Sequence, residues 1–88
     1  MIKIPLKVID AAGLHARPAS ILAAAAGKYS SKLEIEHNGK RSNLKSIIGI
    51  LALGITVDSE IAICADGEDA VSALTSMVEL IKENSIAR

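Results

Sequence analysis

The segment Gly13-Leu14-His15-Ala16-Arg17-Pro18-Ala19-Ser20 leads into a stretch that is rich in alanine. Pro18 suits the first turn of a helix, because the N–H that its ring removes would have no partner within that helix. The sequence therefore predicts that a helix begins close to His15, directly after a glycine turn. Small residues at positions 13 and 16 leave the histidine open to a docking partner.

This helix start has the features of an anion-binding site. If His15 is the N-cap, the free amides of Ala16 and Arg17 point outward beside the imidazole, and the positive end of the helix dipole adds to them. The same positive field favours the neutral ring, which keeps a lone pair for attack. Arg17 adds a fixed cation whose planar donors match phosphate oxygens. We predict a phosphate site; the alternative is that His15 only caps the helix and Arg17 is a solvated surface charge.

The rest of the chain shows two kinds of apolar periodicity, that of strands and that of helices. Apolar and polar residues alternate with the period of half-buried strands, and Asn38-Gly39 is a favoured two-residue hairpin turn. The predicted strands cover residues 2–8, 32–37, 40–43 and 60–65, and the predicted helices cover residues 16–26, 47–53 and 69–84. The order βαββαβα indicates an α+β open-faced sandwich, in which three helices cover one face of a four-stranded antiparallel sheet.

The same periodicity predicts which side chains form the core. Pro5 either weakens the prediction of the first strand or marks an exposed position in it, since it cannot donate to a ladder. Gly27 is placed to end the first helix, and Glu68 and Asp69 complement the N-terminus of the last one. The predicted core side chains of these three elements are Ile2, Ile4, Leu6 and Val8; Ala19, Leu22, Ala23 and Ala26; and Ala70, Val71, Leu74, Met77, Val78 and Ile81.

Ser46 precedes a short apolar run that ends at Gly54. A serine N-cap before the run and a glycine after it favour a short helix over a buried strand. Such a helix is apolar nearly all round, so we expect Ile50 and Leu53 to face the core. The remaining apolar side chains, Ile47, Ile48 and Leu51, then form an outward patch of the kind that marks docking surfaces. The alternative is that all of them are core.

Composition excludes several functional classes. The chain has 88 residues, half of them hydrophobic, and Tyr29 is its single aromatic, so stacking on bases is not available. The single cysteine, Cys64, excludes an internal disulfide and a cysteine-cluster metal site, and we expect it to be a small buried hydrophobe. No apolar run is long enough to span a membrane. We expect no signal peptide, because residues 1–8 alternate with Lys and Pro instead of forming a continuous apolar segment. We expect a cytoplasmic protein without metal or cofactor that binds neither nucleic acid nor membrane.

Charge is distributed unevenly along the chain. Residues 1–50 carry eight Lys or Arg and three acids, whereas residues 51–88 carry two Lys or Arg and seven acids. Because the basic half holds His15, we expect the reactive face to attract an acidic protein partner. His37 is the one rival histidine, but it lies at a strand end beside a turn and away from any helix start. We expect His37 to be structural.

Two segments of the chain resemble the HPr family, the histidine-containing phosphocarriers of the bacterial sugar phosphotransferase system. Residues 13–20 resemble its active-site segment. Residues 43–49, with residues 53–55 beyond them, resemble its regulatory serine segment at the expected spacing. The resemblance runs over essentially the whole chain, so we expect one HPr domain over residues 1–88, with the HPr-like fold.

The resemblance implies a phosphoryl relay rather than a turnover enzyme. His15 would accept a phosphoryl group from enzyme I, which phosphoenolpyruvate charges, and pass it to the IIA domains of sugar permeases, with Arg17 stabilising the phosphate. We expect a monomer that docks through Ser20 and the apolar patch. The family commonly has Ser or Asn where this chain has Ala12, and some members carry basic residues at the positions of Ala24 and Gly27.

The resemblance also leaves a regulatory role open. In many Gram-positive members a dedicated HPr kinase/phosphorylase acts on the serine that corresponds to Ser46, and the product is a co-repressor partner of a catabolite control protein. The chain could therefore be mainly a binding module switched at Ser46, or a carrier of a nitrogen-related branch. Regulatory homologues that have lost the relay lack the histidine, so His15 favours the relay.

Overall fold

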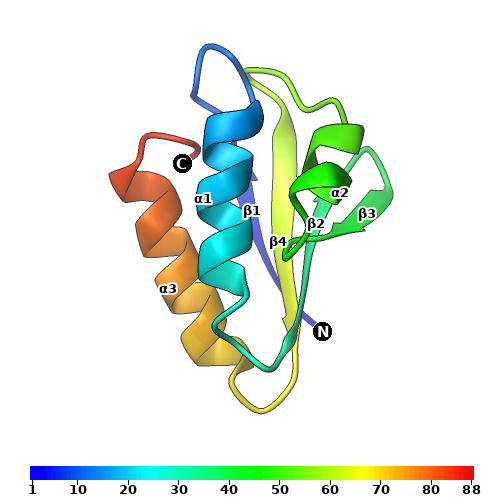
Figure 1. The fold of residues 1–88 in the computed structure, drawn as a ribbon, viewed down its shortest axis with the longest axis vertical. Helices are drawn as coiled ribbons and strands as arrows, with labels where there is room; N and C mark the ends of the chain where they lie inside the picture. Colours follow the sequence, from blue (N-terminus) through cyan, green and yellow to red (C-terminus); the bar gives the residue numbers. More distant parts are fainter.

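The computed structural model describes all 88 residues of the chain. Seven elements follow one another in the predicted order (Figure 1). They are β1 (Ile2–Lys7), α1 (Ala16–Ala26), β2 (Lys32–His37), β3 (Lys40–Asn43), α2 (Ile47–Ala52), β4 (Glu60–Asp66) and α3 (Ala70–Glu83). Each agrees with its predicted counterpart to within a residue or so at either end, and the predicted fold class is confirmed.

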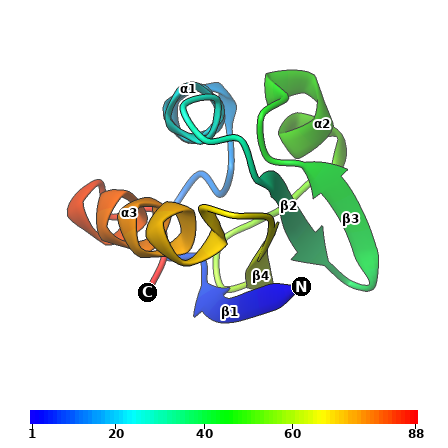
Figure 2. The same cartoon turned by 90° about the horizontal axis from the view of Figure 1, so that it is seen from below.

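The four strands form one antiparallel sheet in the order β1-β4-β2-β3. All three helices lie on the same side of it, which Figure 2 shows in a view along the sheet. Asn38 and Gly39 join β2 to β3 with φ angles of 51° and 76°. Positive φ at both residues is the geometry of the tight hairpin turn that the sequence predicts. Pro5 is exposed in β1, an edge strand, where a missing N–H is tolerated.

The core fills the space between the sheet and the helices. Leu33, Ile35, Ile61 and Ile63 come from the sheet, and they meet the buried sides of α1 and α3. The predicted buried side of α1, which is Ala19, Leu22, Ala23 and Ala26, is confirmed. Because three of these four side chains are methyl groups, α1 lies close to its neighbours. Gly27 is the C-cap, as predicted, although its φ of −62° is right-handed rather than left-handed.

Two predicted core side chains, Ile2 and Val71, are exposed, and Ile4 and Val78 are only half-buried. Ile2 is 45% exposed, because it begins an edge strand at the end of the sheet. Val71 is 68% exposed, and Ala73 is buried in its stead. Successive helical residues are about 100° apart around the axis, so Val71 lies on the flank of a stripe centred on Ala70, Ala73 and Leu74.

Asp69 also differs from its predicted role. It is the N-cap of α3, but its side chain makes no capping hydrogen bond. Its carboxylate instead accepts hydrogen bonds from the backbone N–H groups of Ser30 and Ser31, both at 3.0 Å, and from both serine hydroxyls. The side chain therefore joins the loop before β2 to the start of α3, and Ser31 is buried at this junction.

The C-terminal tail returns to the end of β1. Ala87 forms an isolated antiparallel bridge with Val8, and Lys7 and Arg88 exchange backbone hydrogen bonds of 2.6 and 2.9 Å. Ile86 and Ala87 are fully buried. The tail thus anchors the chain just before the loop that leads to His15, an arrangement that the sequence pattern did not predict.

Candidate functional site

The loop from Val8 to Leu14 is fixed by backbone hydrogen bonds to distant parts of the chain. The N–H groups of Ile9 and Asp10 donate to Ile86 O at 2.9 and 3.3 Å, and the N–H of Leu14 donates to Ile55 O at 3.0 Å. Gly13 has a φ of +69°, and a Cβ atom there would collide with the Ile55 carbonyl. Only glycine allows both this conformation and this close approach. Together they set the direction in which the chain enters α1.

His15 is the N-cap of α1, as predicted. Its φ and ψ are −81° and −170°, its carbonyl accepts the N–H of Ala19 at 3.1 Å, and its side chain makes no capping bond. The backbone N–H groups of Ala16 and Arg17 have no acceptor within the protein. The imidazole is 38% exposed. A ring nitrogen and two unbonded amides are therefore together at an open helix start, where an anion is stabilised.

Asp10 brings the two predicted site side chains together. Its Oδ2 lies 3.2 Å from Arg17 Nη2 and 3.4 Å from His15 Nε2, while its Oδ1 accepts the N–H of Ala12 at 3.0 Å. The Ala12 N–H, and then the neighbouring His15 and Arg17, hold the pKa of the Asp10 carboxyl below its ordinary value. An ionised carboxylate thus lies between the histidine and the arginine.

The sequence did not predict the ion pair between Arg17 and Asp10. The Arg17 side chain is 56% exposed, and its guanidinium pairs with the Asp10 carboxylate. The role of Arg17 toward a phosphate stays a prediction. Asp10 is the residue at this site that the sequence analysis did not identify. The sequence feature that could have identified Asp10 is its position two residues before Ala12 and three before Gly13. This spacing is typical of an Asx turn, in which the Asp carboxylate accepts a backbone N–H two residues later.

Ser46 caps α2, as predicted. Its Oγ accepts the N–H of Gly49 at 3.0 Å. Ile50 is fully buried and Leu53 packs against the core, whereas Ile47, Ile48 and Leu51 are 41%, 80% and 40% exposed. The predicted outward patch is therefore confirmed, and the alternative in which every apolar side chain of α2 is core is wrong.

A shallow groove of about 590 Å³ lies between α1 and α2. Three of the four predicted docking residues, Ser20, Ile47 and Ile48, line it, and Leu51 lies farther along α2. The Ser20 hydroxyl donates to Ala16 O at 2.8 Å, within the first turn after His15. We call this surface, made of Ser20, Ala23, Ala24, Lys45, Ser46, Ile47, Ile48 and Leu51, the α1–α2 face. Its use for docking remains a prediction.

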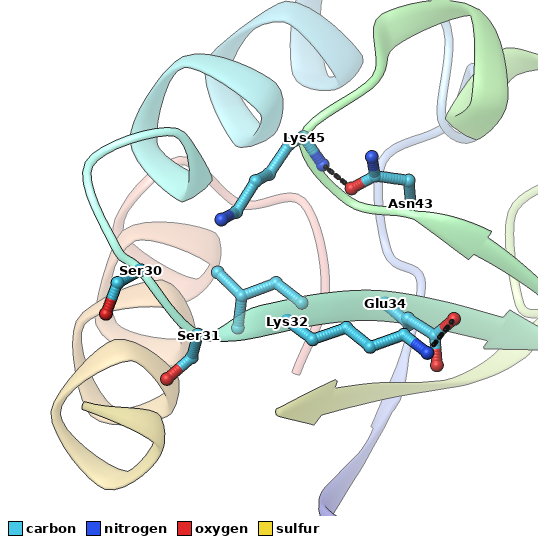
Figure 3. Close-up of a pocket in the computed structure, with 7 residues that line it drawn as sticks. Ser30, Ser31, Lys32, Glu34, Asn43 and Lys45 are labelled. Atoms are coloured by element: carbon cyan, nitrogen blue, oxygen red, sulfur yellow. Dashed lines mark hydrogen bonds and ion pairs between the residues drawn. The ribbon is translucent and has the colours of Figure 1, made fainter. Parts of the chain in front are cut away.

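A second pocket, of about 320 Å³, lies at the other end of α1 beside the start of β2 (Figure 3). Its polar groups are occupied within the protein. Lys45 Nζ donates to Tyr29 O at 2.7 Å, the Lys45 N–H donates to Asn43 Oδ1 at 2.9 Å, and Lys32 pairs with Glu34 at 4.0 Å. It shares no lining residue with the loop that holds His15, so we do not assign chemistry to it.

The other chemical side chains of the sequence stay outside the site. Cys64 is fully buried, and burial raises the pKa of its thiol, which fits the predicted role as a small hydrophobe. His37 is half-buried and makes no side-chain hydrogen bond. No group of three or more metal-ligating side chains is assembled, and no helix has the length and apolarity needed to cross a membrane.

The chain matches one protein-family model and several solved structures. The model of the phosphotransferase-system HPr component, which describes its phosphorylation site, matches residues 2–83. The chain belongs to the HPr family. A histidine-containing phosphocarrier protein from Mycoplasma is 40% identical, with a TM-score of 0.95 and 99% of both chains covered. The phosphocarrier protein HPr from Bacillus anthracis is 35% identical, with a TM-score of 0.82 over 90% of this chain and 94% of that one.

The HPr fold also includes a regulatory relative. The catabolite repression protein Crh from Bacillus subtilis, solved as a domain-swapped dimer, is 31% identical, with a TM-score of 0.74 over 98% of this chain and 94% of that one. As an HPr phosphocarrier, the present chain is a phosphoryl relay protein rather than an enzyme.

Proposed function

We propose that His15 accepts a phosphoryl group from enzyme I, after phosphoenolpyruvate has charged that enzyme, and passes it to the IIA domains of sugar permeases in the cytoplasm. The observation that carries this proposal is the helix start itself. An exposed imidazole lies beside two backbone amides without protein acceptors and beside the guanidinium of Arg17. Amides at a helix N-terminus and an arginine fork both bind phosphate oxygens.

The shallowness of the site suits a relay. The His15 side chain is 38% exposed and Arg17 is 56% exposed, so a partner protein can approach the ring directly. Two amides and one cation stabilise a phosphoryl group without enclosing it. A carrier needs this balance, because a phosphate held in a deep pocket would not leave for the next acceptor.

The α1–α2 face supports protein docking next to this site. It begins at Ser20, one turn after Ala16, and continues across the exposed Ile47 and Ile48. Apolar side chains surrounded by polar ones are typical of a docking surface. We propose that enzyme I and the IIA domains bind this face, with the excess of basic residues in the first half of the chain drawing an acidic partner surface.

A second candidate function, regulation through Ser46, rests on the position of that residue. Ser46 lines the α1–α2 face between Lys45 and Ile47, so a phosphate there would add negative charge inside the proposed docking surface. The matching Crh relative supports a regulatory use of this fold. We propose that an HPr kinase/phosphorylase modifies Ser46 in a host that encodes one, and that a catabolite control protein binds the product.

The relay is tested by incubating the protein with enzyme I, magnesium and phosphoenolpyruvate and then measuring its intact mass. We expect one added phosphoryl group that is labile in acid and stable in alkali, as phosphohistidine is. His15→Ala should abolish the addition, whereas His37→Ala should retain it. Labelling of His15→Ala at the wild-type level would show that the acceptor lies elsewhere. The same assay with enzyme I of a nitrogen-related branch distinguishes the two routes.

A further inference from the structure

We propose that Asp10 is a positioning residue for phosphoryl transfer, because its carboxylate selects the ring nitrogen of His15 that attacks and holds Arg17 beside that ring. The proposal rests on the proposed function of His15 and adds a residue to it. Neither the matched segment at residues 13–20 nor the helix start includes Asp10. It enters the site only through the folding of the loop between Val8 and Leu14.

The Asp10 carboxylate is held in one orientation. Its backbone N–H donates to Ile86 O at 3.3 Å and its carbonyl accepts the N–H of Gly13 at 2.9 Å. Its Oδ1 accepts the N–H of Ala12 at 3.0 Å, and its side chain is only 14% exposed. With one oxygen fixed by the loop, the other oxygen faces the histidine and the arginine rather than solvent.

This orientation selects a tautomer of His15. A neutral imidazole has one nitrogen that donates and one that accepts, whereas an ionised carboxylate only accepts. Asp10 Oδ2 lies 3.4 Å from Nε2, so their contact is favourable when Nε2 carries the proton. The lone pair is then on Nδ1. Nδ1 is then the nitrogen available for the attack on phosphorus, and Asp10 is the residue whose position favours this tautomer.

The transfer step balances with this assignment. The Nδ1 lone pair forms the new bond to phosphorus, while the bond between phosphorus and the donor atom breaks and its electron pair returns to the donor. Nε2 keeps its proton, so the ring acquires positive charge as the new bond forms. The carboxylate beside Nε2 stabilises that charge, in the way that a buried aspartate stabilises an imidazolium in hydrolases.

Arg17 receives its position from the same carboxylate. Its Nη2 lies 3.2 Å from Asp10 Oδ2, the oxygen that also faces the ring. Because this ion pair already orders the guanidinium, Arg17 loses less conformational entropy when it binds the incoming phosphoryl group. The phosphoryl group carries more negative charge than the carboxylate, so Arg17 can exchange one partner for the other without leaving the site.

Asp10→Asn tests the proposal with a nearly isosteric change. The Ala12 N–H requires an acceptor, so the amide oxygen takes the position of Oδ1 and the NH₂ group takes that of Oδ2. The NH₂ group then donates to Nε2, which favours the proton on Nδ1, and it no longer pairs with Arg17. We expect the initial rate of phosphoryl acceptance from enzyme I to fall about tenfold, the effect of one ordinary hydrogen bond.

Nitrogen-15 NMR of the neutral His15 ring provides the second measurement. Wild type should carry the proton mainly on Nε2, and Asp10→Asn should shift the ratio toward Nδ1. The control is Asp66→Asn, which makes the same charge change at an exposed position outside the site and should match wild type in both measurements.

Folding of each variant is checked by circular dichroism. A wild-type ring that carries its proton mainly on Nδ1 would overturn the proposal, and this measurement needs no variant. A folded Asp10→Asn variant that keeps the wild-type tautomer ratio would also overturn the proposal, whatever its rate of phosphoryl acceptance. A folded variant that keeps the wild-type rate of phosphoryl acceptance would overturn it as well. If wild type accepts no phosphoryl group on His15, the proposed function fails instead, and the tautomer measurement still decides what Asp10 does to the ring.

Discussion

Arg17 Nη2 lies 3.2 Å from Asp10 Oδ2, so the cation proposed to stabilise the phosphoryl group on His15 is already held by a carboxylate in the unphosphorylated protein. The two side chains are separated by a glycine turn and the first residues of α1. Their pairing places the guanidinium next to the His15 ring, whose Nε2 faces the same oxygen. The unphosphorylated site is therefore organised before any partner binds.

Replacing Arg17 should affect transfer before it affects stability. Arg17→Ala removes a phosphate-directed fork, and we expect the rate of phosphoryl transfer to His15 to fall about tenfold or more. An exposed ion pair contributes little to folding, so the melting temperature should change little. Steady-state rates with enzyme I at varied concentration of this protein provide the measurement. An unchanged transfer rate would remove Arg17 from the site.

Gly13→Ala should destabilise the protein more than Gly39→Ala. Both glycines have positive φ, at +69° and +76°, and this conformation costs an alanine about 1–2 kcal/mol. A Cβ at position 39 meets nothing within 4 Å, whereas a Cβ at position 13 collides with the Ile55 carbonyl. Thermal unfolding of the two variants makes the comparison. Equal melting temperatures would show that the contact between Gly13 and Ile55 does not constrain the loop.

Asp69→Asn should reduce stability in a pH-dependent way. The hydrogen bond from the Ser31 hydroxyl, followed by that from the Ser30 N–H, lowers the pKa of the Asp69 carboxyl below its ordinary value of 3.8. A carboxyl with a lowered pKa in the folded state stabilises the fold above the unfolded pKa and loses that contribution as the pH falls through the folded pKa.

Wild type should therefore melt at a higher temperature than Asp69→Asn at pH 7, and the difference should shrink as the pH falls below about 4. Asp66→Asn, at an exposed position without a side-chain hydrogen bond, serves as the control for the change of charge. A difference that stays constant from pH 7 to pH 2 would contradict the assignment to the Asp69 carboxylate.

A charge on the α1–α2 face should weaken docking. Ile48→Glu places a carboxylate in the apolar patch, and Val71→Glu makes a similar change on α3 at a side chain that is 68% exposed, compared with 80% for Ile48. Neither should unfold the protein. We expect Ile48→Glu to raise the KM of enzyme I for this protein about tenfold, since truncating or charging a central contact commonly costs this much. The same rise in Val71→Glu would place docking elsewhere.

Ser46 offers a test of the proposed switch. Ser46→Asp keeps a good N-cap and adds charge beside Ile47, so it should slow phosphoryl acceptance at limiting concentration of this protein without unfolding it. Ser46→Ala should leave the relay working and block an HPr kinase, at a cost of about 1 kcal/mol for the lost cap. Equal acceptance rates in Ser46→Asp and wild type would leave Ser46 as a helix cap only.

Local sequence determines much of this fold. The hairpin at Asn38 and Gly39, the Ser46 cap and the start of α1 at His15 each depend on a few adjacent residues with strong conformational preferences. Strand alternation and helical spacing likewise identified the elements and most of the core. The two predicted core residues that are exposed, Ile2 and Val71, lie at an element end and on a helix flank, where burial depends on what covers them.

Tertiary structure alone decided how the site is completed. Asp10 reaches His15 and Arg17 because its loop is bonded at one end to Ile86 in the C-terminal tail and at the other to Ile55. The Asp69 carboxylate likewise accepts hydrogen bonds from the loop before β2 instead of capping its own helix. A sequence pattern reflects the conformational preferences of neighbouring residues. The positions of these two carboxylates depend instead on contacts between segments that are distant in the chain. Such contacts form only when the whole sheet and its helices are assembled.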